Sequence, residues 1–333
     1  MNQQEPDTMP CPPPPREHLT NPATRSALLV QHHMLAAVRQ RMHARGFVEV
    51  LPPIIGPVTD PGVRGSKQVD VDYYGHRYKL MTSAILYKQA SLLAFDRIFC
   101  IAPNVRLEPP QTMPTGRHLT EFHQIDVEIA DAGRDEAMAV AEDVVVHAVR
   151  QVVAELPGEL EALGRDTGAF TETLQQRFDR ITHATAVGDL AALGHSQNPE
   201  AEIDWTGEAM LSHKAVRPFF VTDYPKGSRG FYDREDPDSP GVLRNFDLIA
   251  PEGYGELISG SEREFEYARI IARMRETGEN PAKYGWYLTM VRQGIRRSSG
   301  FGLGVERLTR YLTGLPCVWQ VSAYPKVPGV VSP

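Results

Sequence analysis

The chain has 333 residues, of which 41% are hydrophobic and 23% charged, and its formal net charge at pH 7 is −7. No apolar run approaches the roughly 20 residues that a membrane helix needs, and the N-terminus lacks the basic and apolar segments of a secretory signal. We therefore expect a globular, cytoplasmic protein without a membrane partner. The acidic balance argues against a broad nucleic-acid surface, which requires clustered positive charge.

The first segment is polar and rich in proline, with four consecutive prolines at 12–15. We expect residues 1–20 to be a disordered arm and residues 21–333 to form one domain. A helix is predicted to begin with Asn21 as its N-cap and Pro22 in its first turn, and to end at Gly46. The stretch FVEVLPPII then predicts a strand that stops at Pro52 and Pro53.

Further elements follow in pairs. The stretch YKLMTSAILYKQASLLAF predicts a short strand and a helix capped by Ser83, and RIFCIAPNVRLE with EFHQIDVEIA predicts an antiparallel hairpin. Residues 135–155 are expected to form a packing helix. Residues 156–215 mix helical pieces with glycine and proline and are a possible insertion.

The C-terminal part alternates in the same manner. RPFFVTDYP and LRNFDLIAP predict strands, whereas EREFEYARIIARMRE and VERLTRYLTGL predict helices. Strands that come in hairpins, with helices between the clusters, favour an α+β domain built on an antiparallel sheet over a Rossmann fold.

The strand EFHQIDVEIA has two different faces, because alternate side chains point in opposite directions. Its apolar face is predicted to be core and holds Ile125, Val127 and Ile129. The other face carries an aromatic ring, an amide and two acids: Phe122, Gln124, Asp126 and Glu128. Taken alone, this strand is most simply interpreted as half-exposed with a solvated polar face.

The preceding strand adds Arg106 and Glu108, which are two residues apart and so share a face. Side by side, the two strands would present a cation suited to phosphate, a ring suited to stacking and acids suited to an ammonium group. The alternative is a cross-strand ion pair, which stabilises little when exposed.

At this point the sequence resembles the class II aminoacyl-tRNA synthetases of the aspartyl/asparaginyl subgroup. RLE at 106–108, RHLTEF at 117–122 and QIDVE at 124–128 resemble the second signature motif, and VRQRMHARGFVEVLPPII resembles the first. The family's amino-acid-binding stretch resembles TSAILYKQ, and its metal-binding and recognition segment resembles FDLIAPEGYGELISGSERE. The third motif resembles GLGVER at 302–307. The resemblance spans about residues 25–315 and implies a class II antiparallel sheet flanked by helices.

The resemblance implies that ATP and Mg²⁺ are cofactors. Arg106 would hold the α-phosphate, Arg307 would contact the γ-phosphate and form one wall of the adenine slot, and Phe122 would stack on the other side. Asp247 and Glu256 would bind the Mg²⁺, an ion that prefers oxygen ligands. The implied ATP-binding set, with Arg106, Arg307 and Glu256 as catalytic residues, is Arg106, Glu108, His118, Phe122, Glu256, Gly304 and Arg307.

The amino-acid substrate is implied to be aspartate or a close analogue. Arg263 would grip its side chain and Lys88 would add a second cation, whereas Asp60 and Asp126 could receive its ammonium group. A lysine at position 88 goes with aspartate in this family, although GYGELISGS is closer to the asparaginyl type, and Lys88 could instead be a solvated helix residue. The implied amino-acid-binding set is Asp60, Ser83, Lys88, Gln124, Asp126, Ser259 and Arg263.

The sequence also departs from the family pattern. No N-terminal β-barrel for anticodon binding precedes the first motif, which makes tRNA an unlikely partner. Ile85 stands where aspartyl enzymes have a glutamine, Ser298 stands where a histidine is usual, and AYPKVPG replaces the usual Phe-Pro-Arg near the end.

Together these features resemble archaeal-type asparagine synthetases. We expect an AMP-forming ligase that makes an aspartyl adenylate and transfers the acyl group to ammonia or another amine. Transfer to a carrier, residual tRNA aminoacylation and a non-catalytic amino-acid-binding role are the alternatives. The first motif implies a homodimer, although the apolar stripe of the helix at 22–45 is equally that of any core-facing helix.

Overall fold

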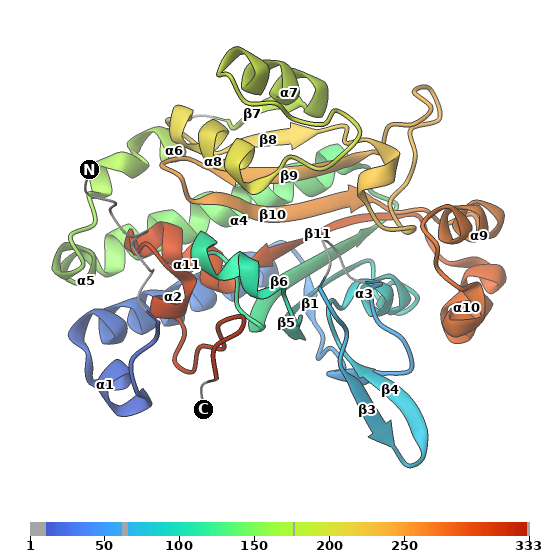
Figure 1. Ribbon diagram of the computed structural model, residues 1–333, viewed down its shortest axis with the longest axis horizontal. Helices are drawn as coiled ribbons and strands as arrows, with labels where there is room; N and C mark the ends of the chain where they lie inside the picture. The colour runs from blue at the N-terminus through green and yellow to red at the C-terminus, as the bar shows by residue number, and fades with distance from the viewer. Residues whose placement is uncertain (1–10, 62–65, 176, 332–333) are drawn as a thin grey trace, which may run out of the picture.

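We describe a computed structural model of the chain, which covers residues 11–61, 66–175 and 177–331 (Figure 1). A large sheet runs through the centre, and a small sheet projects from one end of it. None of the described helices is both long and apolar enough to cross a membrane.

The helices are α1 (Pro15–Thr20), α2 (Pro22–Ala44), α3 (Ile85–Ser91), α4 (Arg134–Glu155), α5 (Pro157–Ala162), α6 (Thr171–Gln175), α7 (His183–Ala192), α8 (Trp205–Lys214), α9 (Tyr267–Glu276), α10 (Gly285–Gly294) and α11 (Val305–Thr313). The strands are β1 (Val48–Glu49), β2 (Ile55–Gly56), β3 (Asp70–Tyr73), β4 (His76–Leu80), β5 (Arg97–Val105), β6 (Glu121–Ala130), β7 (Asp179–Thr182), β8 (Phe219–Thr222), β9 (Asn245–Ala250), β10 (Gly255–Glu262) and β11 (Ser298–Gly304).

The large sheet has eight strands in the order β1-β5-β6-β11-β10-β9-β8-β7. Its two outer pairs, β1 with β5 and β7 with β8, are parallel, and the inner pairs are antiparallel. The predicted hairpin is confirmed as β5–β6, with Cys100 opposite Asp126. The last strand, β11, lies between β6 and β10, so that segments from distant parts of the sequence meet at the centre. The α+β class is confirmed.

The main core lies between one face of this sheet and the helices α2, α4 and α11. On β6 it takes Ile125, Val127 and Ile129, which confirms the predicted apolar face. The helix α2 begins as expected, because the Asn21 side chain accepts a hydrogen bond from the backbone N–H of Ala23 at 2.9 Å. The opposite face of β6 is therefore left for the functional site.

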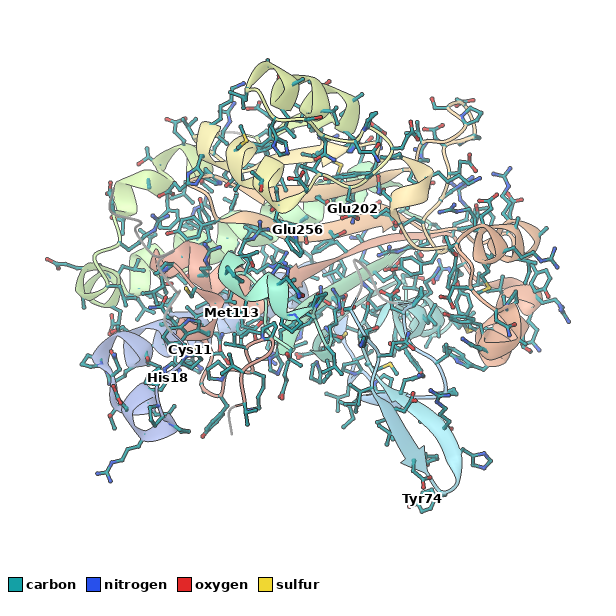
Figure 2. The ribbon with its side chains drawn as sticks, in the orientation of Figure 1. Cys11, His18, Tyr74, Met113, Glu202 and Glu256 are labelled. Carbon is teal, nitrogen blue, oxygen red and sulfur yellow. The ribbon has the colours of Figure 1, made fainter. Side chains whose placement is uncertain are left out.

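The predicted strand FVEVLPPII is broken in the structure. Only Val48–Glu49 and Ile55–Gly56 are strands, and they belong to different sheets. Pro52 and Pro53 lie between them and have no backbone N–H to donate to a neighbouring strand, which prevents a continuous ladder. The second strand joins the β3–β4 hairpin, whose tip carries the exposed Tyr74 (Figure 2).

The expected disordered arm is wrong for Pro15–Thr20, which form helix α1. His18 in this helix is buried, and its Nε2 lies 2.8 Å from the carbonyl oxygen of Ser322, so a long-range contact orders the segment. Residues 1–10 lie outside the described part. The segment 156–215 supplies β7, which extends the main sheet; its origin as an insertion stays a prediction.

The helix predicted from EREFEYARIIARMRE begins later than expected. Glu262 ends strand β10, where it pairs with Ser299, and α9 starts only at Tyr267. The Glu264 side chain accepts hydrogen bonds from the backbone N–H groups of Phe265 and Glu266 at 2.9 and 3.0 Å. Backbone pairing at Glu262 and Arg263, followed by this turn at Glu264, thus delays the start of the helix.

Candidate functional site

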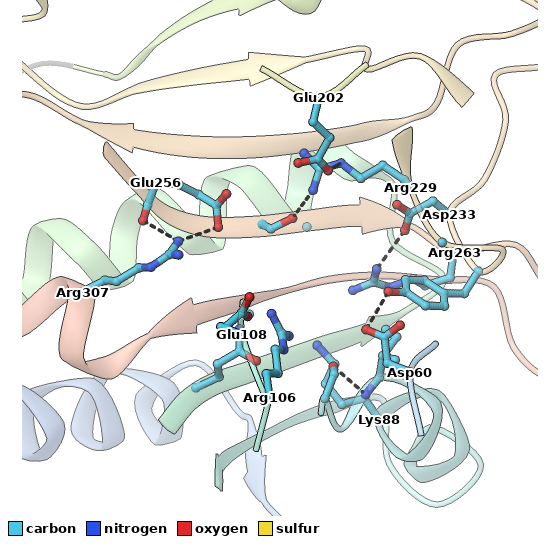
Figure 3. A pocket seen from close by; sticks show the side chains of 18 of the residues that line it. Asp60, Lys88, Arg106, Glu108, Glu202, Arg229, Asp233, Glu256, Arg263 and Arg307 are labelled. Atoms are coloured by element: carbon cyan, nitrogen blue, oxygen red, sulfur yellow. Dashed lines mark hydrogen bonds and ion pairs between the residues drawn. The ribbon is translucent and has the colours of Figure 1, made fainter. Parts of the chain in front are cut away.

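Two adjoining compartments open on the face of β6, β10 and β11 that points away from α4. We call them the charged pocket and the slot; Figure 3 shows a close view of the charged pocket. The charged pocket is lined by Asp60, Ser83, Ile85, Lys88, Arg106, Glu108, His118, Gln124, Glu202, Trp205, Arg229, Gly230, Tyr232, Asp233, Glu256, Ser259, Gly260, Arg263, Gly302 and Arg307. The slot adds Arg117, Leu119, Phe122, Leu257, Gly304, Glu306 and Val318.

Two arginines stand where the compartments join. Arg106 follows β5, and its Nε donates to the carbonyl oxygen of Thr82 at 2.9 Å. Arg307 lies in the first turn of α11, and its Nη1 donates to Glu256 Oε1 at 2.9 Å and to the Glu256 carbonyl oxygen at 3.1 Å. Figure 3 shows Arg307 and Glu256 on one side of the cavity and Arg106 nearer its middle. Both guanidinium groups line both compartments.

The slot is partly apolar, and planar groups stand in its wall. The Phe122 ring lies beneath the Arg106 guanidinium, whose carbon is 5.1 Å from the ring centre. Leu119, Leu257 and Val318 supply further apolar surface. A planar aromatic ligand could therefore stack on a ring or on a guanidinium group here, as both present flat faces.

His118 is positioned by two contacts at the junction. Its Nδ1 is 2.8 Å from the Thr115 hydroxyl, and its ring lies 5.0 Å from that of Trp205. Trp205 begins α8, so the segment 156–215 contributes a wall of the site.

Gly302 forms part of the floor of both compartments. A Cβ atom at this position would meet Gln124 Nε2 at 2.9 Å and Asp126 Oδ1 at 3.1 Å, closer than real contacts normally allow. The glycine therefore lets β11 lie close beside these β6 side chains.

Asp247 and Glu256 come from the adjacent strands β9 and β10. Asp247 is 2% exposed, and Arg229 Nη2 donates to its Oδ2 at 2.5 Å. Burial raises the pKa of Asp247, the Arg229 charge opposes this, and the negative charge of Glu256 raises the pKa further. The two carboxylates are thus close enough to repel each other.

This donor set fits a divalent ion of the Mg²⁺ type. Such an ion binds protein through one or two carboxylates and completes its shell with water and substrate phosphates. Among the described residues no group of three or more histidine, cysteine, aspartate or glutamate side chains is arranged as a metal site. A two-carboxylate site at Asp247 and Glu256 would depend on water and phosphate oxygens for the remaining ligands. The Asp247 carboxylate would then have to contact both the ion and Arg229.

Lys88 lies on α3 and is 3% exposed. Its Nζ donates to Asp126 Oδ1 at 2.8 Å and to the Phe301 carbonyl oxygen at 3.1 Å, and it is 3.7 Å from Glu128 Oε2. The structure therefore excludes the alternative that Lys88 is solvated. Instead it is a buried cation at the wall of the charged pocket.

Arg263 is the second buried cation of this pocket. Its Nε and Nη2 donate to the two oxygens of Glu128 at 3.1 and 3.3 Å, and Nη1 donates to Ser261 Oγ at 2.7 Å. Ser298, which stands where the family usually has a histidine, donates a hydrogen bond to Glu128 Oε1 at 2.8 Å. Ser298 thus supports the acid that orients Arg263.

Asp60 also lines the charged pocket, and Figure 3 shows it at the end of the cavity that holds Lys88 and Arg263. It is 4% exposed, and the Tyr232 hydroxyl donates to its Oδ2 at 3.1 Å. Burial is the main cause that raises the pKa of Tyr232, so this hydroxyl remains a donor. Ser83 and Ile85 line the same pocket, and the Ser83 hydroxyl accepts from the backbone N–H of Ile85 at 3.2 Å.

Most of the site residues expected from the sequence come together, but Asp126 requires a correction. Asp126 is 2% exposed, holds Lys88 from behind and lines neither compartment, so it is not placed to receive a substrate ammonium group. Asp247 lines neither compartment and lies behind Arg229, so it could hold an ion beside Glu256 only if Arg229 shared its carboxylate.

Five residues of the charged pocket with charged or aromatic side chains lie outside the motifs recognised in the sequence: Glu202, Trp205, Arg229, Tyr232 and Asp233. Three of them belong to the stretch RGFYD at 229–233, between β8 and β9. The only sequence signal was a cluster of charged and aromatic residues directly after a strand. Arg229 Nε lies 2.8 Å from Glu202 Oε1, which joins this stretch to the segment before α8.

Residues 17–328 match the family model described as tRNA synthetases class II (D, K and N). The asparagine–tRNA ligase of Pyrococcus abyssi is 32% identical over 316 residues, which are 95% of this chain and 71% of that protein. The asparagine–tRNA ligase of Thermococcus gammatolerans is 33% identical over 322 residues, which are 95% of this chain and 72% of that protein.

A solved structure has the same architecture. The asparaginyl-tRNA synthetase of Pyrococcus horikoshii, complexed with asparaginyl-adenylate, superposes with a TM-score of 0.90 at 32% identity. The superposition covers 96% of this chain and 72% of that one. The sequence similarity and the fold therefore agree over almost the whole chain.

Proposed function

Since the chain belongs to the class II tRNA synthetase family of the D, K and N type, we propose that it activates an amino acid with ATP. The products of this step would be an aminoacyl-adenylate and pyrophosphate. The observation that carries the proposal is the junction of the two compartments, where Arg106 and Arg307 both face a stacking slot and a charged pocket. An adenylate needs such a pair of adjoining sites, one for the nucleotide and one for the acyl group.

The reaction requires the substrate carboxylate to attack the α-phosphorus while pyrophosphate leaves. Negative charge then develops on the phosphate oxygens, and fixed guanidinium groups stabilise it without reorganising. Arg106 would act at the α-phosphate and Arg307 at the leaving group. Phe122 would hold the adenine ring, with Glu108 near its amino group.

Mg²⁺, when bound, would further stabilise the negative charge that develops on the phosphates. Glu256 and Asp247 are the residues that would hold it. Arg307 Nη1 already donates a hydrogen bond to Glu256 Oε1 at 2.9 Å. The same carboxylate would therefore position both the arginine and the ion that contacts the phosphates.

The amino acid is proposed to be asparagine or aspartate, bound in the charged pocket. Asp60 would take the ammonium group, and Lys88 with Arg263 would face the side-chain oxygen. Lys88 favours aspartate by its charge, whereas the relatives reported above are asparagine–tRNA ligases. The choice between asparagine and aspartate depends on the other charges of the pocket.

We propose tRNA as the acceptor, because the similar proteins are tRNA ligases. The expectation that tRNA is an unlikely partner has no support from these comparisons. Ammonia is the second candidate, since the buried Lys88 suits aspartate, and an aspartyl adenylate attacked by ammonia would yield an amide, AMP and a proton.

A second copy of the chain is the proposed partner in solution. Large apolar side chains are exposed between β1 and β2 and just after α3: Leu51 is 95% exposed, Ile54 60%, Leu93 57% and Phe95 43%. Leu51 and Ser91 line one groove, so these two segments lie together. A contiguous apolar surface of this kind is typical of an interface.

ATP–pyrophosphate exchange with each amino acid tests the activation step. Exchange with asparagine or aspartate is expected; its absence with every amino acid contradicts the proposed function. Charging of tRNA with labelled amino acid, and amide formation after ammonia is added, then identify the acceptor. Amide formation without tRNA charging would favour the second candidate.

A further inference from the structure

Asp233 is a buried acid that faces the charged pocket from the loop between β8 and β9. It is 5% exposed, and its backbone pairs with that of Arg263. Its Oδ1 accepts hydrogen bonds from the Ser261 hydroxyl and from Arg263 Nη1, the latter at 3.4 Å. No described residue donates a hydrogen bond to its other oxygen, Oδ2. Figure 3 shows Asp233 beside Arg263 at the end of the cavity that also holds Lys88.

The charges at this end of the pocket do not favour another carboxylate. Its two cations, Lys88 and Arg263, each already face an acid from behind. Lys88 pairs with Asp126 at 2.8 Å, and Arg263 pairs with Glu128 at 3.1 Å. Asp233 adds a third acid to the ion pairs of these two cations, although Arg229 and Arg273 also act on it with positive charge.

Burial raises the pKa of Asp233, although the hydrogen bond from Ser261 and the charges of Arg263, Arg229 and Arg273 oppose the rise. The surrounding donors therefore compensate the buried charge only in part. A ligand group that donates a hydrogen bond to the free oxygen would complete the compensation, whereas a ligand carboxylate would add a like charge in a buried place.

We propose that Asp233 is a specificity-determining residue, which accepts a hydrogen bond from the side-chain amide of the substrate and so selects asparagine over aspartate. This inference rests on the proposed amino-acid activation. An amide matches the pocket because its oxygen can accept from Lys88 or Arg263 while its NH₂ group donates to Asp233 Oδ2. An aspartate side chain offers no donor and would meet Asp233 with a negative charge.

Asp60 allows this assignment because it provides a separate acid for the substrate ammonium group. Its carboxylate is held by the Tyr232 hydroxyl at 3.1 Å, and it lines the same pocket. Asp233 has a different partner, since it accepts a hydrogen bond from Arg263 Nη1 at 3.4 Å. Tyr232 and Asp233 are adjacent in the chain, and each of them makes one of these two contacts.

The test compares kcat/KM in ATP–pyrophosphate exchange with asparagine and with aspartate. The unaltered chain is expected to prefer asparagine by at least about tenfold, and Asp233→Asn should lower that ratio by about 10- to 100-fold, the range for losing a hydrogen bond to a charged group. Asp238→Asn makes the same chemical change at an exposed position of the same loop and should leave the ratio unchanged.

Three results would overturn the inference. A preference of the unaltered chain for aspartate does so without any variant, even where Asp233→Asn fails to fold. An equal loss with both amino acids in Asp233→Asn would assign the residue to structure or to the ammonium group. Exchange with neither amino acid removes the proposed function itself, whereas the first two results leave it standing.

Discussion

The guanidinium of Arg117 and the carboxylate of Glu208 form a buried ion pair that joins the loop before β6 to helix α8. The same carboxylate accepts a hydrogen bond from the backbone N–H of Glu256. One acid from the segment 156–215 therefore fixes both the Arg117 wall of the slot and the strand that carries Glu256. The two side chains are 7% and 5% exposed, so little solvent screens the pair.

Glu208→Gln should destabilise the fold strongly, because it leaves the Arg117 charge buried without a counter-charge. Removing one partner of a buried ion pair costs about 3–5 kcal/mol. Urea unfolding at equilibrium measures this loss. Glu172→Gln, at an exposed position in the first turn of α6, is the control and should change stability by less than about 1 kcal/mol. Equal stability of the two variants would contradict the structural role of the pair.

Arg307→Ala and Arg106→Ala should each lower the rate of ATP–pyrophosphate exchange by about 10²- to 10³-fold, the effect of removing one fixed donor to a developing charge. Arg39→Ala is the control, since Arg39 forms an exposed ion pair with Glu49. Thermal unfolding should show that all three variants remain folded. A fully active Arg307→Ala variant would remove this arginine from the proposed phosphate contacts.

Ser298→Ala should weaken amino-acid binding and leave ATP binding unchanged. It removes the donor at 2.8 Å from Glu128, which then holds Arg263 less firmly. We expect KM for the amino acid to rise by about tenfold, the effect of losing a hydrogen bond to a buried charged group. Ser299→Ala is the neighbouring control, because its hydroxyl donates only to the Ser261 carbonyl oxygen at 3.1 Å. Equal rises in KM for the amino acid and ATP would point to a general loss of structure.

The stability of the fold should decrease with pH through His123. The hydrogen bond to Glu306 raises the pKa of His123 above its ordinary value of about 6.5. The protonated histidine is therefore favoured in the folded state, and its stabilising contribution is complete below about pH 6.5 and is lost as pH rises through the raised pKa. Unfolding midpoints measured from pH 6 to 9 should fall less in His123→Gln than in the unaltered chain. His76→Gln, on the exposed β3–β4 hairpin, should keep the original pH dependence; identical slopes for all three proteins would exclude His123 as the cause.

Leu51→Asp should dissociate the proposed homodimer, because it places a charge in the apolar surface between β1 and β2. Sedimentation velocity at several protein concentrations reports the mass of the species. Val216→Asp, at a position that is 72% exposed and lies between α8 and β8, should leave the mass unchanged. An unaltered chain that sediments as a monomer at working concentration would contradict the interface.

The sequence predicted the strand β6 and its role well, because a period of two is a strong signal. It placed Ile125 and Val127 in the core and put Asp126 and Glu128 on the functional face. It did not predict that those two acids lie behind the pocket wall. Their burial depends on Lys88 in α3 and on Arg263 directly after β10, and no local pattern predicts pairing between residues so far apart in the sequence.

The residues from irregular segments could not be predicted for a related reason. Glu202 and Asp233 lie in loops, where neither spacing nor alternation fixes the direction of a side chain. Their places follow from long-range contacts, with Arg229 and Arg263 respectively. Arg106 and Arg307 were predictable because motif resemblance, rather than periodicity, identified them.

The position of β11 within the large sheet has a consequence for folding during synthesis. Strands β6 and β10 both pair with β11, which is made after nearly all the rest of the chain. Until residue 304 has left the ribosome, two partial sheets each keep an unpaired edge of backbone N–H and C=O groups. The nascent chain would therefore remain prone to aggregation late in translation, and a chaperone that shields strand edges would act at that stage.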